Sequence, residues 1–171
     1  MVYKKALNLS VTFLLIFILT GCASTRKNVE QILFGGGNNN EAEIVSNAIP
    51  GSSQDFTVNV GDRVFFATNS TSLDDDAKAI LERQASWLEL YPEISIIVEG
   101  HADERGTREY NLALGARRAN SAREFLVSRG IENTRIQTVS FGKERPVELC
   151  SNEKCYRENR RAVSVVSNLN F

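Results

Sequence analysis

The order of hydrophobic patterns after Asp55 constrains the fold of this chain more than any other feature of its sequence. Two stretches have apolar residues at helical spacing, one ending at Pro92 and one covering about 108–129. Short apolar or alternating runs, typical of β-strands, occur at 56–66 (one or two strands), 94–98, 136–141 and 162–166. This alternation predicts an α+β fold in the order β-α-β-α-β plus a final strand, with a mixed sheet covered by helices.

Residues that commonly cap helices stand at the ends of both helical stretches. Ser72 can cap the first helix, with Asp75 at its third position and acidic side chains at the positive end of its dipole. Thr107 can cap the second helix, and Gly130 can end it. We therefore expect the second helix to begin directly after Thr107, and residues 100–106 to form the loop before it.

The first residues of the chain have the pattern of an export signal. Two lysines precede an apolar run at 11–19, which is shorter than the ~20 residues that a membrane-spanning helix needs. Residues 19–22 resemble the lipobox of bacterial lipoproteins, whose cysteine is lipidated and becomes the new N-terminus. We expect a cleaved signal peptide over 1–21 and a lipid on Cys22; the alternative is an ordinary secretory signal with a chance cysteine. Among lipoproteins, a residue such as Ala23 after the cysteine indicates the outer membrane, with the domain in the periplasm.

Residues 22–54 differ in composition from the rest of the chain. Glycines at 35–37 and asparagines at 38–40 stand among isolated apolar residues that have no sustained period. Such a segment cannot bury enough apolar surface to offset the entropy cost of ordering it. We therefore expect a flexible linker over 22–54, which tethers a single folded domain over 55–171.

Charge and residue counts argue against several classes of function. The chain has 20 basic and 21 acidic residues, a balance that does not fit a nucleic-acid binder held by phosphate contacts. One histidine, His101, and three cysteines are a small supply of metal ligands and catalytic bases. We therefore expect no metal, no cofactor, no nucleic-acid partner and no enzyme activity.

One face of the second predicted helix carries strongly polar side chains among apolar ones. At 100° per residue, Arg118 and Asn111 fall on the face that packs against the sheet, whereas Arg117 falls outside it. A buried guanidinium needs a partner, and the loop at 99–107 offers Asp103. Periodicity leaves two interpretations open. Asp103 either pairs with Arg118 or caps the helix for structural reasons, or the two side chains form a binding site.

Several separated motifs resemble those of the OmpA-like peptidoglycan-binding domain family. The resemblance covers about 64–166, with motifs at 98–107, 110–111, 117–119, 140–146 and 159–163. It implies the fold of that family and non-covalent binding of the diaminopimelate-containing peptide of peptidoglycan. In the family, a loop Asp receives the ammonium of meso-diaminopimelate and a helix Arg receives a carboxylate of the same residue. These positions are Asp103 and Arg118 here.

The resemblance also implies roles for four neighbouring residues. Phe66 and Asn69 are expected to line the same cleft; many relatives carry an Asp in place of Asn69, so the local charge is reduced here. Asn111 is expected to hold the loop through side-chain hydrogen bonds, and Thr107 to cap the helix beside it. These last two residues would support the site without contacting the ligand.

The lipoprotein members of this family imply a location and a set of partners. By resemblance, we expect an outer-membrane lipoprotein that tethers the membrane to the cell wall, with TolB and other Tol components as partners. The implied role is in envelope integrity and in outer-membrane constriction at division. Two alternatives remain. A cell-wall hydrolase would need a nucleophile with a base or a zinc site, and a stator-type wall anchor would need a membrane-spanning helix.

Two further cysteines, Cys150 and Cys155, lie close together near the end of the chain. In an oxidising periplasm they can form a disulfide, which would contribute about 2 kcal/mol to stability by closing a short loop. The alternative is a pair of free thiols. Their spacing does not suit a zinc site without further ligands.

Overall fold

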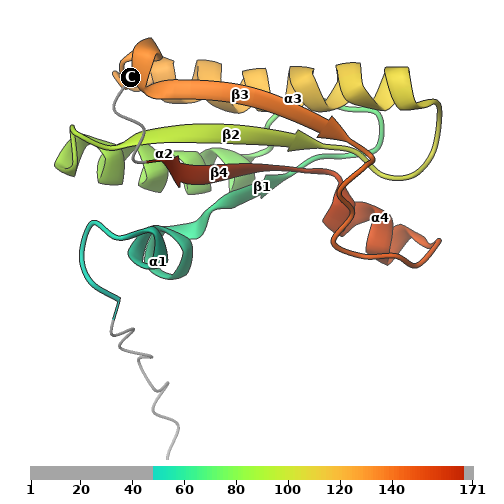
Figure 1. Cartoon of the computed structure of the whole chain (residues 1–171), viewed down its shortest axis with the longest axis horizontal. Coiled ribbons are helices and arrows are strands. Elements are labelled where there is room, and N and C mark those ends of the chain that lie inside the picture. The colour runs from blue at the N-terminus through green and yellow to red at the C-terminus, as the bar shows by residue number, and fades with distance from the viewer. Residues whose placement is uncertain (1–47, 168–171) are drawn as a thin grey trace, which may run out of the picture. The chain divides into compact units, whose positions relative to one another are not determined.

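A computed structural model of the chain describes residues 48–167, and the predicted signal peptide, Cys22 and most of the predicted linker lie outside them. The described elements, shown in Figure 1, are α1 (Ser53–Asp55), the π-helical turn η1 (Phe56–Gly61), β1 (Arg63–Phe65), α2 (Asp75–Leu90), β2 (Ser95–His101), α3 (Arg108–Ser128), η2 (Asn133–Arg135), β3 (Ile136–Gly142), α4 (Glu153–Asn159) and β4 (Arg161–Ser167). Within this part of the chain, no helix is both long and apolar enough to cross a membrane.

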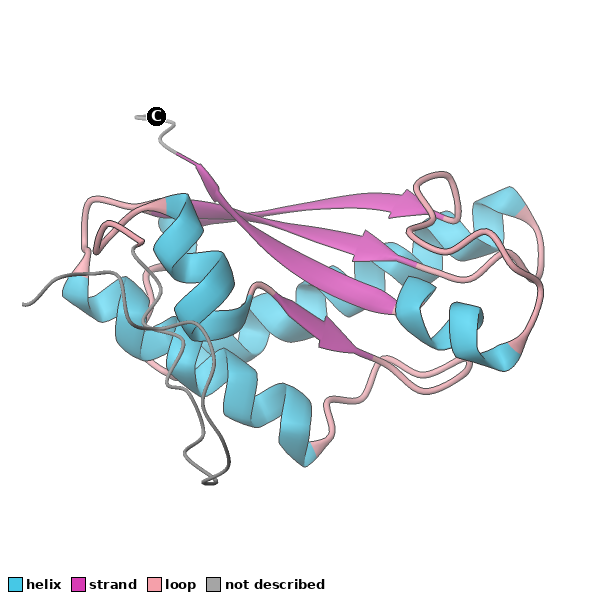
Figure 2. Ribbon diagram, turned by 90° about the horizontal axis from the view of Figure 1, so that it is seen from below, coloured by secondary structure: helices cyan, strands magenta, loops and turns pink. Residues whose placement is uncertain are grey.

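The described strands form one mixed sheet in the order β1-β4-β2-β3. β4 pairs antiparallel with both β1 and β2, whereas β2 and β3 run parallel. The two long helices, α2 and α3, lie on the same face of the sheet (Figure 2). The predicted α+β fold is therefore confirmed, and both long helices and the last three strands lie within a few residues of their predicted positions.

The hydrophobic core lies between the sheet and these two helices. It includes Ile96 and Val98 of β2 together with Leu126 of α3. α3 approaches β2 closely at two glycines, because a Cβ atom on Gly100 would lie only 1.8 Å from the carbonyl oxygen of Gly115. Only glycine permits such an approach. The first half of α3 is therefore held directly beside the end of β2 and the loop that follows it.

The first predicted strand is only partly correct. β1 begins at Arg63, but the alternating segment before it forms η1 instead of a strand. Phe56 and Val60 are buried, while Val58 is 57% exposed. Phe56 and Val60 belong to the alternating pattern, but they are also four residues apart, which is a helical spacing. The pattern therefore did not distinguish the two structures.

The ends of the long helices agree with the sequence in one case and differ in the other. Thr107 caps α3 as predicted, and Gly130 follows this helix with a φ of 94°. α2, however, is capped by Asp74 and not by Ser72, because the Asp74 carboxylate accepts the N–H of Ala77 at 2.8 Å. A carboxylate forms a stronger bond with a helix N-terminus than a hydroxyl does.

Two short segments were not predicted as ordered elements. α4 has 7 residues, and only Cys155 and Asn159 are buried. Two buried positions are too few to show a helical period in the sequence. At the other end, Ser52 caps α1, so regular structure starts a few residues before the predicted boundary at Asp55. In both places the elements are held by capping and tertiary contacts rather than by a long apolar face.

Candidate functional site

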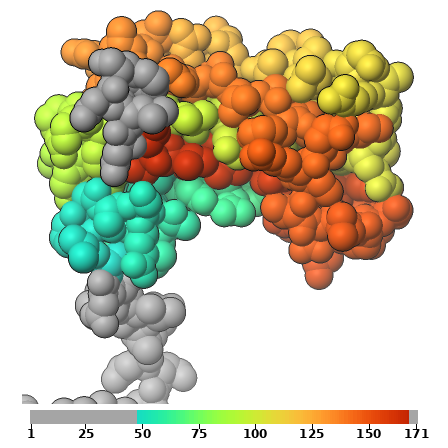
Figure 3. All heavy atoms as spheres, viewed as in Figure 1, coloured from blue at the N-terminus to red at the C-terminus, as the bar shows by residue number. Residues whose placement is uncertain are grey.

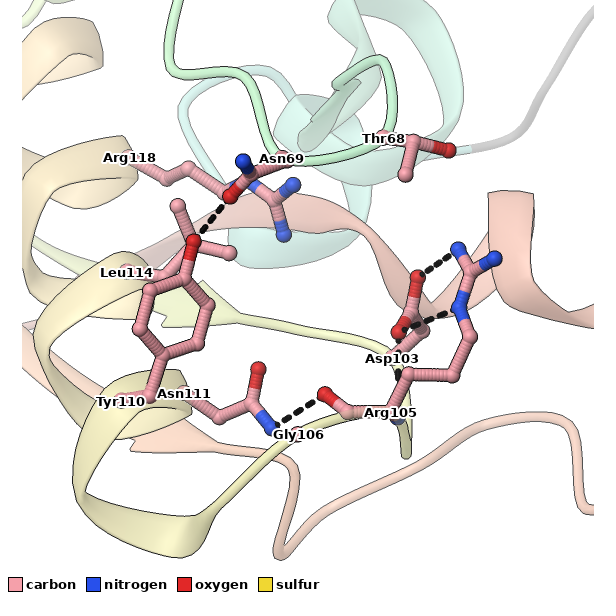
Figure 4. A pocket seen from close by; sticks show the side chains of 9 residues that line it. All are labelled: Thr68, Asn69, Asp103, Arg105, Gly106, Tyr110, Asn111, Leu114 and Arg118. Atoms are coloured by element: carbon pink, nitrogen blue, oxygen red, sulfur yellow. Dashed lines mark hydrogen bonds and ion pairs between the residues drawn. The ribbon is translucent and has the colours of Figure 1, made fainter.

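A pocket of about 370 Å³ opens where the loop after β2 meets the start of α3. The loop after β1, the loop after β2 and α3 line it with Thr68, Asn69, Asp103, Arg105, Gly106, Tyr110, Asn111, Leu114 and Arg118. Figure 4 shows Asp103 and Arg105 on one side of the pocket and Arg118, Asn69 and Tyr110 on the other. The pocket thus presents an acidic and a basic side chain on facing walls.

Arg118 is completely buried, although it is charged. Its guanidinium donates three hydrogen bonds to backbone carbonyls, from Nε to Ser70 at 2.9 Å, from Nη1 to His101 at 2.8 Å and from Nη2 to Ala67 at 3.2 Å. Burial, and then repulsion by the charge of Arg160, lower the pKa of Arg118 to about 10. A guanidinium has five N–H groups. Two therefore remain beyond the three bonds to described residues.

The partner of Arg118 is not the Asp103 carboxylate that the sequence offered for an ion pair. No hydrogen bond or salt bridge joins Arg118 to Asp103 among the described residues. Three carbonyl oxygens take that place, and the Phe66 ring packs 5.2 Å from the guanidinium carbon. Periodicity placed Arg118 inside the protein correctly and Arg117 outside it. Helical periodicity describes a single helix, so it could not predict acceptors that lie in other segments of the chain.

Asp103 is buried beside two arginines, Arg105 and Arg160, whose contact with it was not predicted from the sequence. Its Oδ1 accepts from the N–H and the Nε of Arg105 at 3.2 and 3.1 Å, and its Oδ2 accepts from Nη2 of Arg105 at 2.6 Å and Nη1 of Arg160 at 3.4 Å. Burial acts to raise the pKa of Asp103, but the Arg105 hydrogen bonds and charge, with Arg160, outweigh it and hold the pKa below its ordinary value. Asp103 is therefore ionised at neutral pH.

Arg160 connects this carboxylate to α4. It is only 5% exposed in its side chain, and its Nε donates to the Phe66 carbonyl at 3.0 Å while Nη2 donates to Glu153 at 2.6 Å. α4 and the start of α3 lie at the same end of the sheet, as the red-orange and yellow atoms on the right of Figure 3 show. Arg160 lies in one of the motifs that carried the family resemblance, and that position is the sequence signal for it.

The start of α3 is joined to the loop by the residues expected to support the site. The hydroxyl of Thr107 accepts the N–H of Tyr110 at 3.2 Å. Asn111 is buried, and its Nδ2 donates to the carbonyl of Arg105 at 2.8 Å. These bonds hold the loop backbone on both sides of Gly106, which also lines the pocket.

The structure separates the two residues that we expected to line the cleft after β1. Asn69 lines the pocket, has a left-handed backbone with φ 53°, and accepts a hydrogen bond from the Tyr110 hydroxyl. Phe66 is buried outside the pocket lining, and Thr68 lines the pocket in addition to Asn69. Phe66 instead packs with its ring against the guanidinium of Arg118. From the sequence, Tyr110 was recognisable only as part of a family motif.

Three other residues singled out in the sequence, His101, Cys150 and Cys155, lie outside the pocket lining. His101 is buried and stacks on Phe141 with 5.6 Å between ring centroids, and burial, then the charges of Arg161 and Arg145, lower its pKa to about 4. A disulfide joins Cys150 to Cys155 at the start of α4. Among the described residues, no group of three His, Cys, Asp or Glu side chains is placed to hold a metal ion.

Comparisons with known sequences point to one family. A model of the OmpA family matches residues 65–162, the part of the chain that contains the whole pocket lining. The peptidoglycan-associated lipoprotein of Rhizobium meliloti is 54% identical over 156 residues, which cover 91% of this chain and 85% of that protein. The peptidoglycan-associated lipoprotein of Mesorhizobium japonicum is also 54% identical, over 87% of this chain and 85% of that protein.

Comparisons with solved structures agree. The crystal structure of the peptidoglycan-associated lipoprotein from Burkholderia pseudomallei has a TM-score of 0.64 and 36% identity, and the match covers 68% of this chain and 100% of that one. The C-terminal domain of Helicobacter pylori MotB has a TM-score of 0.58 at 22% identity, covering 62% of this chain and 84% of that one. At that identity the second match shows a shared fold alone.

Proposed function

The chain belongs to the OmpA family, and from this membership and its similarity to the peptidoglycan-associated lipoproteins we propose that it binds peptidoglycan and holds the outer membrane to the cell wall. The observation that carries the proposal is the pocket itself. It brings a buried, ionised carboxylate and a buried guanidinium to facing walls of one cavity. Such a pair is suited to a ligand that carries both charges at one end.

Meso-diaminopimelate has this chemistry, because the free end of its side chain carries one ammonium and one carboxylate. In our proposal, Arg118 receives the carboxylate with the two N–H groups that are not donated to Ala67, Ser70 and His101. Asp103 receives the ammonium. A fork of two parallel N–H groups matches a carboxylate in geometry as well as charge, which an ammonium side chain does not. Asn69 and Tyr110 complete the wall beside Arg118.

Binding of this kind requires no bond to break. We propose a binding protein without catalytic activity, since the pocket offers a charge pair that is already engaged in hydrogen bonds and a hydroxyl of Tyr110 that donates to Asn69. Asp103, the carboxyl group that lines the pocket, has a lowered pKa and is therefore a poor proton donor at neutral pH. Retention of the cell wall, rather than its cleavage, is the expected outcome.

The remaining parts of the chain give the proposal its cellular setting. Residues 1–21 would be removed on export, Cys22 would carry the lipid, and 22–54 would span from the outer membrane to the wall, with the pocket in the periplasm. Two peptidoglycan-associated lipoproteins whose alignments cover 91% and 87% of this chain support this arrangement. As a member of the Tol-Pal system, the protein would contact TolB and other Tol components through surface that includes or borders the pocket.

The test uses residues 22–171 with Cys22→Ser, which lack both the predicted signal peptide and the lipid, and isolated sacculi. We expect the protein to sediment with diaminopimelate-containing sacculi and to release no soluble muropeptides. Sacculi in which lysine replaces diaminopimelate lack the side-chain carboxylate and should retain much less protein. Equal retention on both wall types would contradict diaminopimelate recognition, and released fragments would indicate a hydrolase.

A matched pair of variants assigns the binding to the pocket. Asp103→Asn removes the charge that would attract the ammonium while keeping the size of the side chain. Glu109→Gln removes one acidic charge from an exposed position of α3 at the edge of the same region. Asp103→Asn should lose retention about tenfold or more, the usual scale for one member of a desolvated charge pair. Glu109→Gln should bind like the unmodified protein.

A further inference from the structure

The carboxylate of Asp103 is fully occupied by the protein's own donors. A carboxylate has about four lone-pair positions. All are used here, three by the side chain and the backbone N–H of Arg105 and one by Nη1 of Arg160. A ligand ammonium can therefore bind Asp103 closely only if one of these donors leaves.

Only one of the donors is free to leave. The backbone N–H of Arg105 is fixed, because Asn111 holds the carbonyl of the same residue at 2.8 Å. Arg160 is 5% exposed and is held by the Phe66 carbonyl and by Glu153. The Arg105 side chain, by contrast, is 43% exposed. Its guanidinium is the donor that can move into solvent at the lowest cost.

Two side chains of α4 lie close enough to receive the Arg105 guanidinium if it moves away from Asp103. Nη1 of Arg105 lies 3.9 Å from Oε2 of Glu153, and its guanidinium carbon lies 4.4 Å from the centre of the Tyr156 ring. Glu153 is 64% exposed, so it can follow a shift of its partner. A short movement away from Asp103 would exchange one ion pair for another and keep the contact with the aromatic ring.

We propose that Arg105 determines the specificity of the pocket by acting as an internal competitor for the ammonium of the ligand. In the free protein its guanidinium occupies Asp103. When the ligand binds, the ammonium takes its place and Arg105 moves onto Glu153 and Tyr156. When the Arg105 guanidinium leaves, Asp103 keeps only Nη1 of Arg160 and the backbone N–H of Arg105, so a cationic ligand is needed to restore the charge and the two hydrogen bonds that are lost. The pocket therefore selects peptides with a free amino group and rejects those whose amino group is acylated.

This inference rests on the proposed function, and it has a consequence of its own. If Arg105 competes with the ligand, its occupancy of Asp103 lowers the apparent affinity, because only the fraction of molecules with a free Asp103 can bind. Removing the Arg105 side chain should therefore strengthen binding. A residue that contacts the ligand directly would show the opposite effect.

The first experiment compares Arg105→Met with Arg108→Met by calorimetric titration of a meso-diaminopimelate muropeptide. Both variants lose one positive charge near the pocket, but Arg108 is 73% exposed and pairs with Glu144. Arg105→Met should bind about three- to tenfold more tightly than the unmodified protein, and Arg108→Met should differ by less than about twofold. The same peptide with its side-chain amino group acetylated should bind much more weakly than the free-amine peptide, and with the same low affinity for both variants and the unmodified protein.

The outcomes separate the inference from the proposed function. If the unmodified protein binds neither peptide, the proposed function is wrong. If it binds the free-amine peptide and Arg105→Met binds this peptide equally or more weakly, only the role of Arg105 is wrong. Binding that tightens equally for the free-amine and acetylated peptides would also overturn it, because the effect would then not pass through Asp103.

A second variant tests the position that receives Arg105. Glu153→Gln removes the alternative partner and should weaken binding of the free-amine peptide about two- to threefold. In the Arg105→Met background the same change should have no effect, because there is no side chain left to receive. An equal loss in both backgrounds would show that Glu153 acts through Arg160 alone and would overturn the proposed movement.

Discussion

Replacing Arg118 by lysine should destabilise the fold and weaken binding to cell walls. The guanidinium joins carbonyl oxygens from two parts of the chain, Ala67 and Ser70 after β1 and His101 at the end of β2. A lysine ammonium is a single compact group, and it cannot reach three acceptors that are arranged around a planar fork. At least one buried carbonyl would lose its partner.

The size of the effect follows from these contacts. A buried polar group that loses its hydrogen bond costs about 1–3 kcal/mol, so the loss of one or two bonds should lower the free energy of unfolding by roughly 2–4 kcal/mol. The burial that lowers the pKa of Arg118 to about 10 would also act on a lysine, whose ordinary pKa is about 10.4. The charge that attracts a ligand carboxylate would then be reduced as well, and affinity should fall about tenfold or more.

The neighbouring residue supplies the control. Arg117 is exposed on the same turn of α3, and Arg117→Lys should change stability by no more than about 0.5 kcal/mol. Urea unfolding measures the stability of both variants. Retention on sacculi is then measured under conditions in which circular dichroism shows both to be folded. If Arg118→Lys is as stable as Arg117→Lys, the three carbonyl bonds do not contribute to stability as expected. If the two variants are also retained equally on sacculi, the proposed carboxylate site is wrong.

Three further changes test other parts of the structure. Gly100→Ala would bring a Cβ to 1.8 Å from the Gly115 carbonyl oxygen and should cost about 3 kcal/mol or more, seen as a lower melting temperature; an unchanged melting temperature would contradict the close approach. The lowered pKa of His101, about 4 against 6.5, means that its contribution to stability is present above pH 6.5 and is lost as the pH falls towards 4. Between pH 7 and pH 4, the free energy of unfolding of His101→Phe should therefore fall by about 2–3 kcal/mol less than that of the unmodified protein, as measured by urea unfolding. An equal fall in both proteins would refute this reasoning. Cys22→Ser should abolish fatty-acid labelling in cells and leave a soluble or unprocessed protein, whereas unchanged labelling and membrane retention would exclude Cys22 as the lipid site.

The sequence was sufficient for features that depend on neighbouring residues. The angle of 100° per residue separates Arg118 from Arg117 whatever the helix packs against, and the structure buries the first and exposes the second. The cap at Thr107 depends on a hydrogen bond within one turn. Asp103, Asn69 and Arg118 were also expected near the cleft, and all three line the pocket.

The conformation of short segments could not be predicted from the sequence alone. The alternation at 56–60 was compatible with a strand and with η1, and only packing against α2 decided between them, because Trp87 contacts Phe56 with 4.8 Å between ring centroids. α4 likewise has too few buried positions to show a period. In such segments the local preference is weak, and contacts with the rest of the protein determine the conformation.

The tertiary structure alone decided which atoms meet the two charged groups. Arg118 donates to Ser70, 48 residues earlier in the chain, and Asp103 accepts from Arg160, 57 residues later. The strand order β1-β4-β2-β3 brings these segments together at one end of the sheet. Periodicity reports only which face of an element is buried, whereas a hydrogen bond needs a donor and an acceptor within about 3 Å of each other. The sequence therefore determined that Arg118 lies inside the protein, and the packing of distant segments determined that carbonyl groups, and not Asp103, hold it there.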